Sequence, residues 1–212
     1  MKISAMLVSD NDFTQSLWII HRERNLLMAK YLDVQNLIAR EDSILIVIDV
    51  QDRLMPVIAN REKVIDNIIR LLKFAQIIGL PVVLTEQQKL GPTVPEIKNE
   101  IPHLQPISKI VFNCFFCDDF INHIPQMGRK TLILTGVETH ICVAQTALYA
   151  LPNFTVHVVS DAVSSRTTDN WNIGIERMRQ NGAIVTSTEM VIFELLQRAG
   201  TDEFRTALNL VK

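Results

Sequence analysis

Six short apolar runs, rich in valine and isoleucine, constrain the fold of this 212-residue chain more than any other feature. Most of the runs show no alternation of apolar and polar residues, which is typical of strands buried on both faces of a parallel sheet. Helical patterns lie between most of them. The predicted strands are Ile44–Ile48, Pro81–Leu84, Pro106–Lys109, Thr131–Thr135, Thr155–Ser160 and Ala183–Thr186.

Three glycines indicate that the chain repeats a unit of helix, glycine and strand. Gly79, Gly128 and Gly182 each follow a predicted helix and precede a predicted strand, and glycine at that place commonly ends a helix in the left-handed conformation. The repetition favours βαβ crossovers, and therefore a parallel α/β sheet. The predicted helices include Arg61–Ile78, Thr139–Leu151, Thr168–Gln180, Glu189–Ala199 and Thr201–Val211.

Two segments depart from this pattern. Thr85–His103 has few strand or helix cues and predicts a long loop, with one helical turn at Pro95–Glu100; such loops are often functional. Residues 1–40 predict an N-terminal helical extension to a main domain at 41–212, with mixed apolar patterns at Phe13–Ile20 and Leu26–Ile38. Whether the first 27 residues are a start-site extension or a partner-binding arm stays open.

The composition argues against several classes of function. A formal net charge of −2, with basic residues spread along the chain, gives no reason to expect nucleic acid or a membrane as partner. The sequence contains no G-x-G dinucleotide fingerprint, no Walker-type phosphate loop and no G-x-S-x-G elbow. Three cysteines fit a reducing compartment. Without a long apolar run or a signal-peptide pattern, we predict a cytoplasmic protein.

Asp49 follows the predicted strand Ile44–Ile48 at its carboxyl end, where parallel α/β sheets bind their ligands. A buried carboxylate there needs a partner, and a catalytic base or a metal ligand is a natural use. A helix or turn cap explains the residue equally well. A phosphotransfer aspartate would need a second aspartate two positions on, where Gln51 stands.

Cys142 lies in the first turn of the predicted helix Thr139–Leu151. Free backbone N–H groups and the positive end of the helix dipole favour a thiolate there, and the same N–H groups can hold an oxyanion. A buried structural cysteine is an equally good interpretation. Lys109 ends a short strand, so its side chain can point into the same crevice.

Cys114 and Cys117 form a C-x-x-C motif flanked by aromatic residues. A redox pair or half a zinc site is conceivable, but no second C-x-x-C or H-x-x-x-H pair accompanies it, and no pair of histidines has ligand spacing. We interpret the two cysteines as packing residues.

Residues 42–196 resemble the isochorismatase-like cysteine hydrolases, which include nicotinamidases and many other amidohydrolases. The resemblance implies a three-layer α/β fold with Rossmann-like topology, in which helices cover both faces of a six-stranded parallel sheet. It is carried by five segments, Leu45–Asp52 (LIVIDVQD), Thr85–Gln87 (TEQ), Lys109–Asn113 (KIVFN), Thr135–Val143 (TGVETHICV) and Val159–Ala162 (VSDA).

The resemblance also implies roles for single residues. It implies a catalytic triad of Asp49, Lys109 and Cys142, and a non-proline cis peptide at Val137–Glu138. The oxyanion and cis-peptide loop would be Val137, Glu138, Thr139 and His140, and we expect Gln51, Glu86 and Phe112 to bind substrate.

These residues predict a metal-independent hydrolase of a small amide or related C–N bond, acting through a thioester. The Asp-x-His metal motif of the nicotinamidase branch is absent near residues 49–53 and 85–103, so we expect neither a metal nor another cofactor. The predicted partners are a small-molecule substrate and further copies of the chain, in a dimer or larger homo-oligomer. Two alternatives stay open: a non-catalytic binding or scaffolding protein, and a thiol redox protein that uses Cys114 and Cys117.

Overall fold

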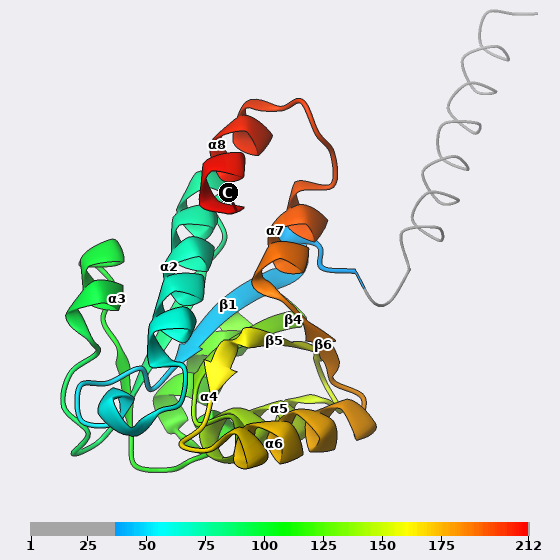
Figure 1. Cartoon of the computed structure of the whole chain (residues 1–212). Coiled ribbons are helices and arrows are strands. Elements are labelled where there is room, and N and C mark those ends of the chain that lie inside the picture. Colours follow the sequence, from blue (N-terminus) through cyan, green and yellow to red (C-terminus); the bar gives the residue numbers. More distant parts are fainter. Residues whose placement is uncertain (1–36, 212) are drawn as a thin grey trace, which may run out of the picture. The chain divides into compact units, whose positions relative to one another are not determined.

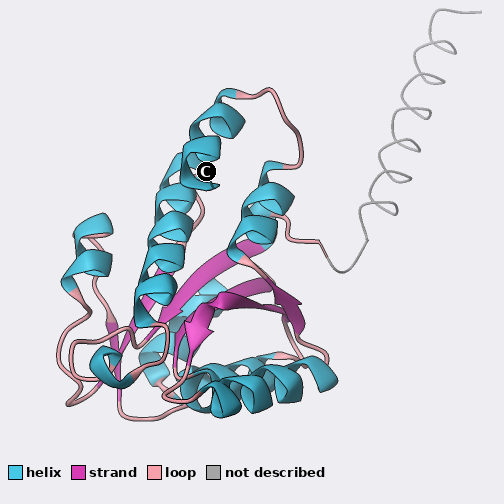
Figure 2. Cartoon of the chain, in the orientation of Figure 1, coloured by secondary structure: helices cyan, strands magenta, loops and turns pink. Residues whose placement is uncertain are grey.

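A computed structural model describes residues 37–211, and these form a six-stranded parallel sheet with helices on both faces (Figure 1, Figure 2). The predicted fold class is therefore confirmed. The helices predicted before residue 37 lie outside the described residues, and the domain boundary at residue 40 stays a prediction. The strands are β1 Ser43–Ile48, β2 Val82–Gln87, β3 Ile107–Lys109, β4 Thr131–Val137, β5 Thr155–Ser164 and β6 Ile184–Thr186.

The central strand explains why the apolar runs do not alternate. All six residues of β1 are buried. Leu45 and Val47 pack into the core beneath α2, α7 and α8, whereas Ile44, Ile46 and Ile48 pack into the opposite core beneath α4, α5 and α6. Both faces thus need apolar side chains. The helices are α2 Arg61–Ile78, α3 Pro95–Glu100, α4 Asp118–Gln126, α5 Ala144–Ala150, α6 Thr168–Gln180, α7 Thr188–Leu196 and α8 Asp202–Val211, with 3-10 turns at Arg40–Asp42, Met55–Val57 and Cys114–Phe116.

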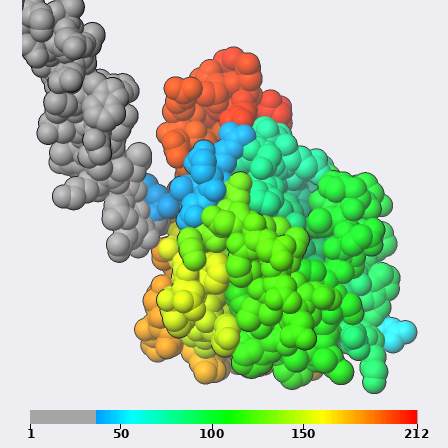
Figure 3. Space-filling model, turned by 180° about the vertical axis from the view of Figure 1, so that it is seen from behind, coloured from blue at the N-terminus to red at the C-terminus, as the bar shows by residue number. Residues whose placement is uncertain are grey.

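The start of the described chain is held against the last two helices. The backbone N–H of Ile38 donates to Glu194 Oε2 at 3.0 Å, and Arg40 forms an ion pair with Glu203 at 3.0 Å. Figure 3 shows this contact from behind, with the blue residues beside the red helix α8. These contacts close one end of the layer formed by α2, α7 and α8.

Several predicted boundaries are wrong. β4 and β5 run on to Val137 and Ser164, and α7 ends at Leu196 instead of Ala199. β2 runs on to Gln87, so the first residues of the predicted loop Thr85–His103 are strand, because they continue the parallel pairing with β1 and β3. The predicted helix Thr139–Leu151 begins with a π-helical turn at Thr139–Val143. There the Val143 N–H donates to the Glu138 carbonyl, five residues back, at 3.2 Å.

The strand order in the sheet is β3-β2-β1-β4-β5-β6. Strands after β1 are added first on one side of it and then, from β4, on the other, so the topological switch point lies between β1 and β4. Open α/β sheets bind ligands at this point, beyond the carboxyl ends of the strands. Asp49 directly follows β1, and the π-helical turn follows β4 after a single residue. The sheet topology therefore brings the two predicted site segments to the same edge.

Gly136 allows β1 and β4 to approach at that edge. It has a φ of 101°, and a Cβ built there would lie 2.0 Å from the Ile48 carbonyl oxygen.

We predict that Gly136→Ala lowers the free energy of unfolding by about 3 kcal/mol or more, because both backbone conformation and space oppose a side chain. Urea denaturation measures this. Gly128→Ala is the matched control, since its φ is 65° but no atom lies within 4 Å of the added Cβ; an equal loss in both variants contradicts the steric argument.

His157 on β5 is a buried polar side chain with no hydrogen-bond partner at either ring nitrogen among the described residues. Burial lowers its pKa from 6.5 to about 4, because a charged ring would lose its hydration. The unfolded chain therefore binds a proton as pH falls below 6.5, while the folded protein does not until about pH 4.

We predict that folding stability conferred by neutral His157 is present above pH 6.5 and is lost progressively toward pH 4. The loss is on the order of 3 kcal/mol. Denaturation curves at several pH values should show a shallower decline for His157→Leu than for the native chain. His103→Leu, at an exposed position, should keep the native decline; identical profiles for all three proteins would refute the assignment.

Candidate active site

Asp49 occupies the turn after β1 with its side chain fully buried. Its φ of 54° is unusual for a residue other than glycine. The Thr85 hydroxyl donates to its Oδ1 at 2.8 Å, and the Asp49 N–H donates to the Thr85 carbonyl at 3.2 Å. The end of β2 thus fixes both the backbone and the carboxylate of Asp49.

Lys109 reaches the same carboxylate from the end of β3. Its ammonium donates to Asp49 Oδ2 at 2.6 Å, to Gln87 Oε1 at 2.8 Å and to the Val111 carbonyl at 3.2 Å. The side chain is only 1% exposed. Burial lowers the pKa of Lys109, but the negative groups around it, Asp49 first, outweigh burial and raise that pKa above its ordinary value. The lysine is therefore a buried cation.

Cys142 completes the cluster from the π-helical turn, with Sγ 3.8 Å from the Lys109 ammonium. Burial and the Asp49 carboxylate raise the pKa of the Cys142 thiol, and Lys109 only partly offsets them. The resting site is therefore an ion pair beside a protonated thiol. We call Asp49, Lys109 and Cys142 the Asp–Lys–Cys cluster; the structure brings together all three residues of the predicted triad.

The predicted oxyanion loop follows β4. The peptide bond Val137–Glu138 is cis. Glu138 is buried and accepts from Arg166 through Nε at 3.1 Å, Nη2 at 3.0 Å and the backbone N–H at 3.0 Å. His140 Nδ1 lies 2.9 Å from Ser165 Oγ, and the buried Thr139 hydroxyl has no partner among the described residues. The loop is thus tied to the segment that links β5 and α6.

The residues predicted to bind substrate occupy different environments. Gln51 is buried, and its amide donates to the Gln87 and Gly91 carbonyls and accepts from the Gln87 N–H at 2.9, 2.6 and 2.8 Å. Glu86 Oε1 accepts from the Thr93 N–H and hydroxyl, each at 2.7 Å. Both side chains therefore hold the loop after β2. Phe112 is exposed, and substrate binding by these three residues stays a prediction.

Thr85 and Gln87 are contact residues of the cluster that the sequence did not single out. They project on one face of β2, two positions apart, and Gln87 pairs in register with Lys109. The polar TEQ end of an otherwise apolar strand was the available signal. Polar residues at a buried strand end indicate a site better than they indicate a loop.

The other two cysteines are free thiols. Cys114 is buried, and burial raises its pKa to about 11. Cys117 is half-buried, with Sγ 3.7 Å from the Ser108 carbonyl. In residues 37–211, no three histidine, cysteine or acidic side chains are grouped to hold a metal ion, and no described helix combines the length and apolarity needed to cross a membrane.

Comparison with known proteins gives the family. The model described as "Isochorismatase domain" matches residues 43–190, which span the whole cluster and all six strands and end in the first turn of α7. This chain belongs to the isochorismatase family. The predicted resemblance is thereby confirmed.

Three similar proteins illustrate the breadth of that family. The secreted isochorismatase effector Isc1 of Phytophthora sojae is 38% identical over 179 residues, covering 80% of this chain and 84% of that protein. A Caenorhabditis elegans structure titled MAR1 ribonuclease is 32% identical with a TM-score of 0.76, over 82% of this chain and 92% of that one. The Escherichia coli YcaC gene product, titled an octameric hydrolase of unknown specificity, is 28% identical with a TM-score of 0.77, over 82% and 90%.

The geometry predicts a stabilising role for the Thr85 hydroxyl. Thr85→Val keeps the shape of the side chain but removes a hydrogen bond to a buried carboxylate, so the free energy of unfolding should fall by about 2 kcal/mol. Thr85→Ser retains the hydroxyl and is the matched control. Chemical denaturation of the three proteins provides the measurement; a valine variant as stable as the native chain would contradict the role of the hydroxyl.

Proposed function

We propose that this isochorismatase-family protein is a metal-independent hydrolase of a small amide or related C–N bond, with Cys142 as nucleophile. The observation that carries the proposal is the position of the Lys109 ammonium, 2.6 Å from Asp49 Oδ2 and 3.8 Å from Cys142 Sγ. A base, a cation and a thiol in one buried group are the parts that nucleophilic catalysis requires.

The first half of the reaction transfers the acyl group to sulfur. Asp49 takes the thiol proton as Cys142 attacks the carbonyl carbon, and Lys109 stabilises the negative charge on the sulfur. Backbone N–H groups of the loop at Val137–Cys142 hold the oxyanion of the tetrahedral intermediate. The C–N bond then breaks, and protonated Asp49 gives its proton to the departing amine, which leaves a thioester on Cys142.

The second half returns the site to its starting state. Asp49 takes a proton from water as the water oxygen attacks the thioester carbon. The C–S bond breaks, the acid product departs, and the proton on Asp49 passes to the sulfur. The raised pKa of the Cys142 thiol supports this order of events, because the nucleophile is activated during attack and is not stored as a thiolate.

We propose no metal ion for the site, because the side-chain oxygens of Gln51 after β1 and of Glu86 on β2 already accept hydrogen bonds from the protein. Glu86 is committed to Thr93, and Gln51 to backbone groups of the same loop.

We also propose that the chain forms a homo-oligomer, for which the octameric E. coli relative is the support. A cytoplasmic location stays a prediction, and one similar relative carries the name of a secreted effector.

The ribonuclease title of the C. elegans neighbour is not extended to this chain. A net charge of −2 offers little general attraction for a polyanion, and the one lysine of the cluster is already paired with Asp49. The competing function is a binding or scaffolding protein that retains the fold without turnover.

A screen of small amides tests the proposal. We predict that turnover falls by at least about a thousandfold in Cys142→Ala, because no other group can form the thioester, and by roughly a hundredfold or more in Asp49→Asn. Product formation and mass spectrometry of the acylated protein are the measurements. Cys114→Ala, which removes the neighbouring buried thiol, should keep most of the activity. An amide hydrolysed at the native rate by Cys142→Ala would overturn the mechanism.

Alkylation separates an enzyme from a scaffold when no substrate is known. Iodoacetamide at neutral pH should modify Cys142 faster than Cys114 and Cys117, because Asp49 assists removal of the thiol proton. Equal, slow labelling of all three cysteines in the native chain would favour the scaffolding function.

A further inference from the structure

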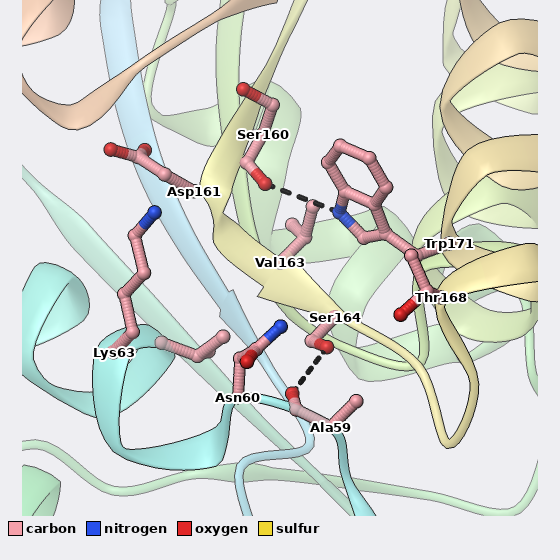
Figure 4. A pocket seen from close by; sticks show the side chains of 10 residues that line it. Ala59, Asn60, Lys63, Ser160, Asp161, Val163, Ser164, Thr168 and Trp171 are labelled. Atoms are coloured by element: carbon pink, nitrogen blue, oxygen red, sulfur yellow. Dashed lines mark hydrogen bonds between the residues drawn. The ribbon is translucent and has the colours of Figure 1, made fainter.

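A second cavity lies beyond the carboxyl end of β5, between the first turns of α2 and α6 (Figure 4). None of the three residues of the Asp–Lys–Cys cluster lines it. Its volume is about 180 Å³, which suits a small molecule.

One wall of the cavity carries opposite charges. Figure 4 shows the Lys63 ammonium and the Asp161 carboxylate on the same side, and neither forms an ion pair with any described residue. Asp161 Oδ1 accepts from the Thr188 N–H at 2.8 Å and its hydroxyl at 3.0 Å, which fixes the carboxylate. Its second oxygen makes no hydrogen bond within the described residues and stays available.

The positive side of this wall is reinforced by the start of α2. Asn60, the residue before the helix, makes no side-chain capping hydrogen bond, and its amide points into the cavity in Figure 4. The first N–H groups of the 18-residue helix α2 therefore add to the attraction of Lys63 for an anion.

The opposite wall is apolar. The Trp171 indole faces the charged pair across the cavity, and its Nε1 donates to the Ser160 carbonyl at 3.2 Å. This bond fixes the ring and leaves its face for contact. Val163 of β5 adds to the apolar lining, and Val64 is an apolar lining residue on α2 beside Lys63.

We propose that this cavity binds a small zwitterion with an apolar group, of which a branched aliphatic α-amino acid is the simplest example. Its carboxylate would face Lys63 and the start of α2, its ammonium would face the free oxygen of Asp161, and its side chain would pack on Trp171. The inference does not depend on the proposed hydrolase activity, because the cavity shares no residue with the Asp–Lys–Cys cluster.

The cavity lies beside the strand that leads into the predicted oxyanion loop. Ser164, which lines the cavity, pairs in register with Val137 of β4. Its hydroxyl donates to the Ala59 carbonyl at 2.6 Å. An occupant therefore contacts the strand beside the loop that begins at Val137.

Calorimetric titration of the full chain with leucine tests the proposal. Leucine should bind at one site, whereas leucinamide, which lacks the carboxylate, and 4-methylpentanoate, which lacks the ammonium, should each bind roughly tenfold more weakly or worse. Lys63→Met should weaken leucine at least tenfold and remove the preference for leucine over leucinamide. Asp161→Asn should remove the preference for leucine over 4-methylpentanoate, while keeping an Oδ1 acceptor for Thr188.

Two variants serve as controls. Lys73→Met removes a lysine elsewhere on α2 and should leave leucine binding unchanged, as should Cys142→Ala. Thermal denaturation of each variant verifies that it folds. The proposal is overturned if leucine shows no saturable binding at millimolar concentration, if both cavity variants bind it like the native chain, or if Cys142→Ala abolishes binding.

Discussion

The buried ion pair between Lys109 and Asp49 is the contact on which the candidate site depends. Lys109 is the last residue of β3, and Asp49 directly follows β1. Strand β2 lies between these two strands. With neighbouring strands about 4.8 Å apart, the backbones are roughly 10 Å from each other, so only a long side chain can cross the end of β2. Desolvating both charges costs several kcal/mol per ion. Thr85 and Gln87 offset part of that cost by occupying the remaining hydrogen-bonding positions of the pair.

The fold was predictable from the sequence wherever burial on both faces removes polar residues. The apolar runs located all six strands, although only β1 and β4 are buried along their whole length and the edge strands β3 and β6 are partly exposed. Arg61–Ile78 and Thr168–Gln180 have the predicted bounds. The end of β2 was missed because Thr85 and Gln87 are polar. Their polarity serves contacts with Asp49 and Lys109 that form only after distant strands meet, so the local TEQ pattern could mark a polar strand end but could not identify its partners. The strand order likewise depends on pairing between segments that are far apart in the chain.

The site residues likewise differ in how far local sequence could identify them. Asp49 and Cys142 could be placed from their positions after strands, whereas Lys109 was selected among the lysines only by family resemblance. Gln51 and Glu86 were predicted to bind substrate, yet both hold the loop after β2, and Gln51 also forms an isolated backbone bridge with Thr93. The sequence could not reveal this use, because it arises from the return of residues 91–93 toward the end of β1.

The protonated state of the Cys142 thiol affects which molecules can react with it. Alkylating agents and oxidants react with the thiolate, so an exposed low-pKa cysteine is modified whether or not substrate is bound. In this site burial and the Asp49 charge hold the proton on Cys142. The proposed mechanism therefore requires a molecule that reaches the sulfur, presents an electrophilic carbon and lets Asp49 accept the proton at the same moment. The ion pair keeps Asp49 Oδ2 2.6 Å from the Lys109 ammonium, the cation that would balance the sulfur's charge in the proposed mechanism. If the proposed mechanism holds, specificity comes from the geometry of access to the sulfur.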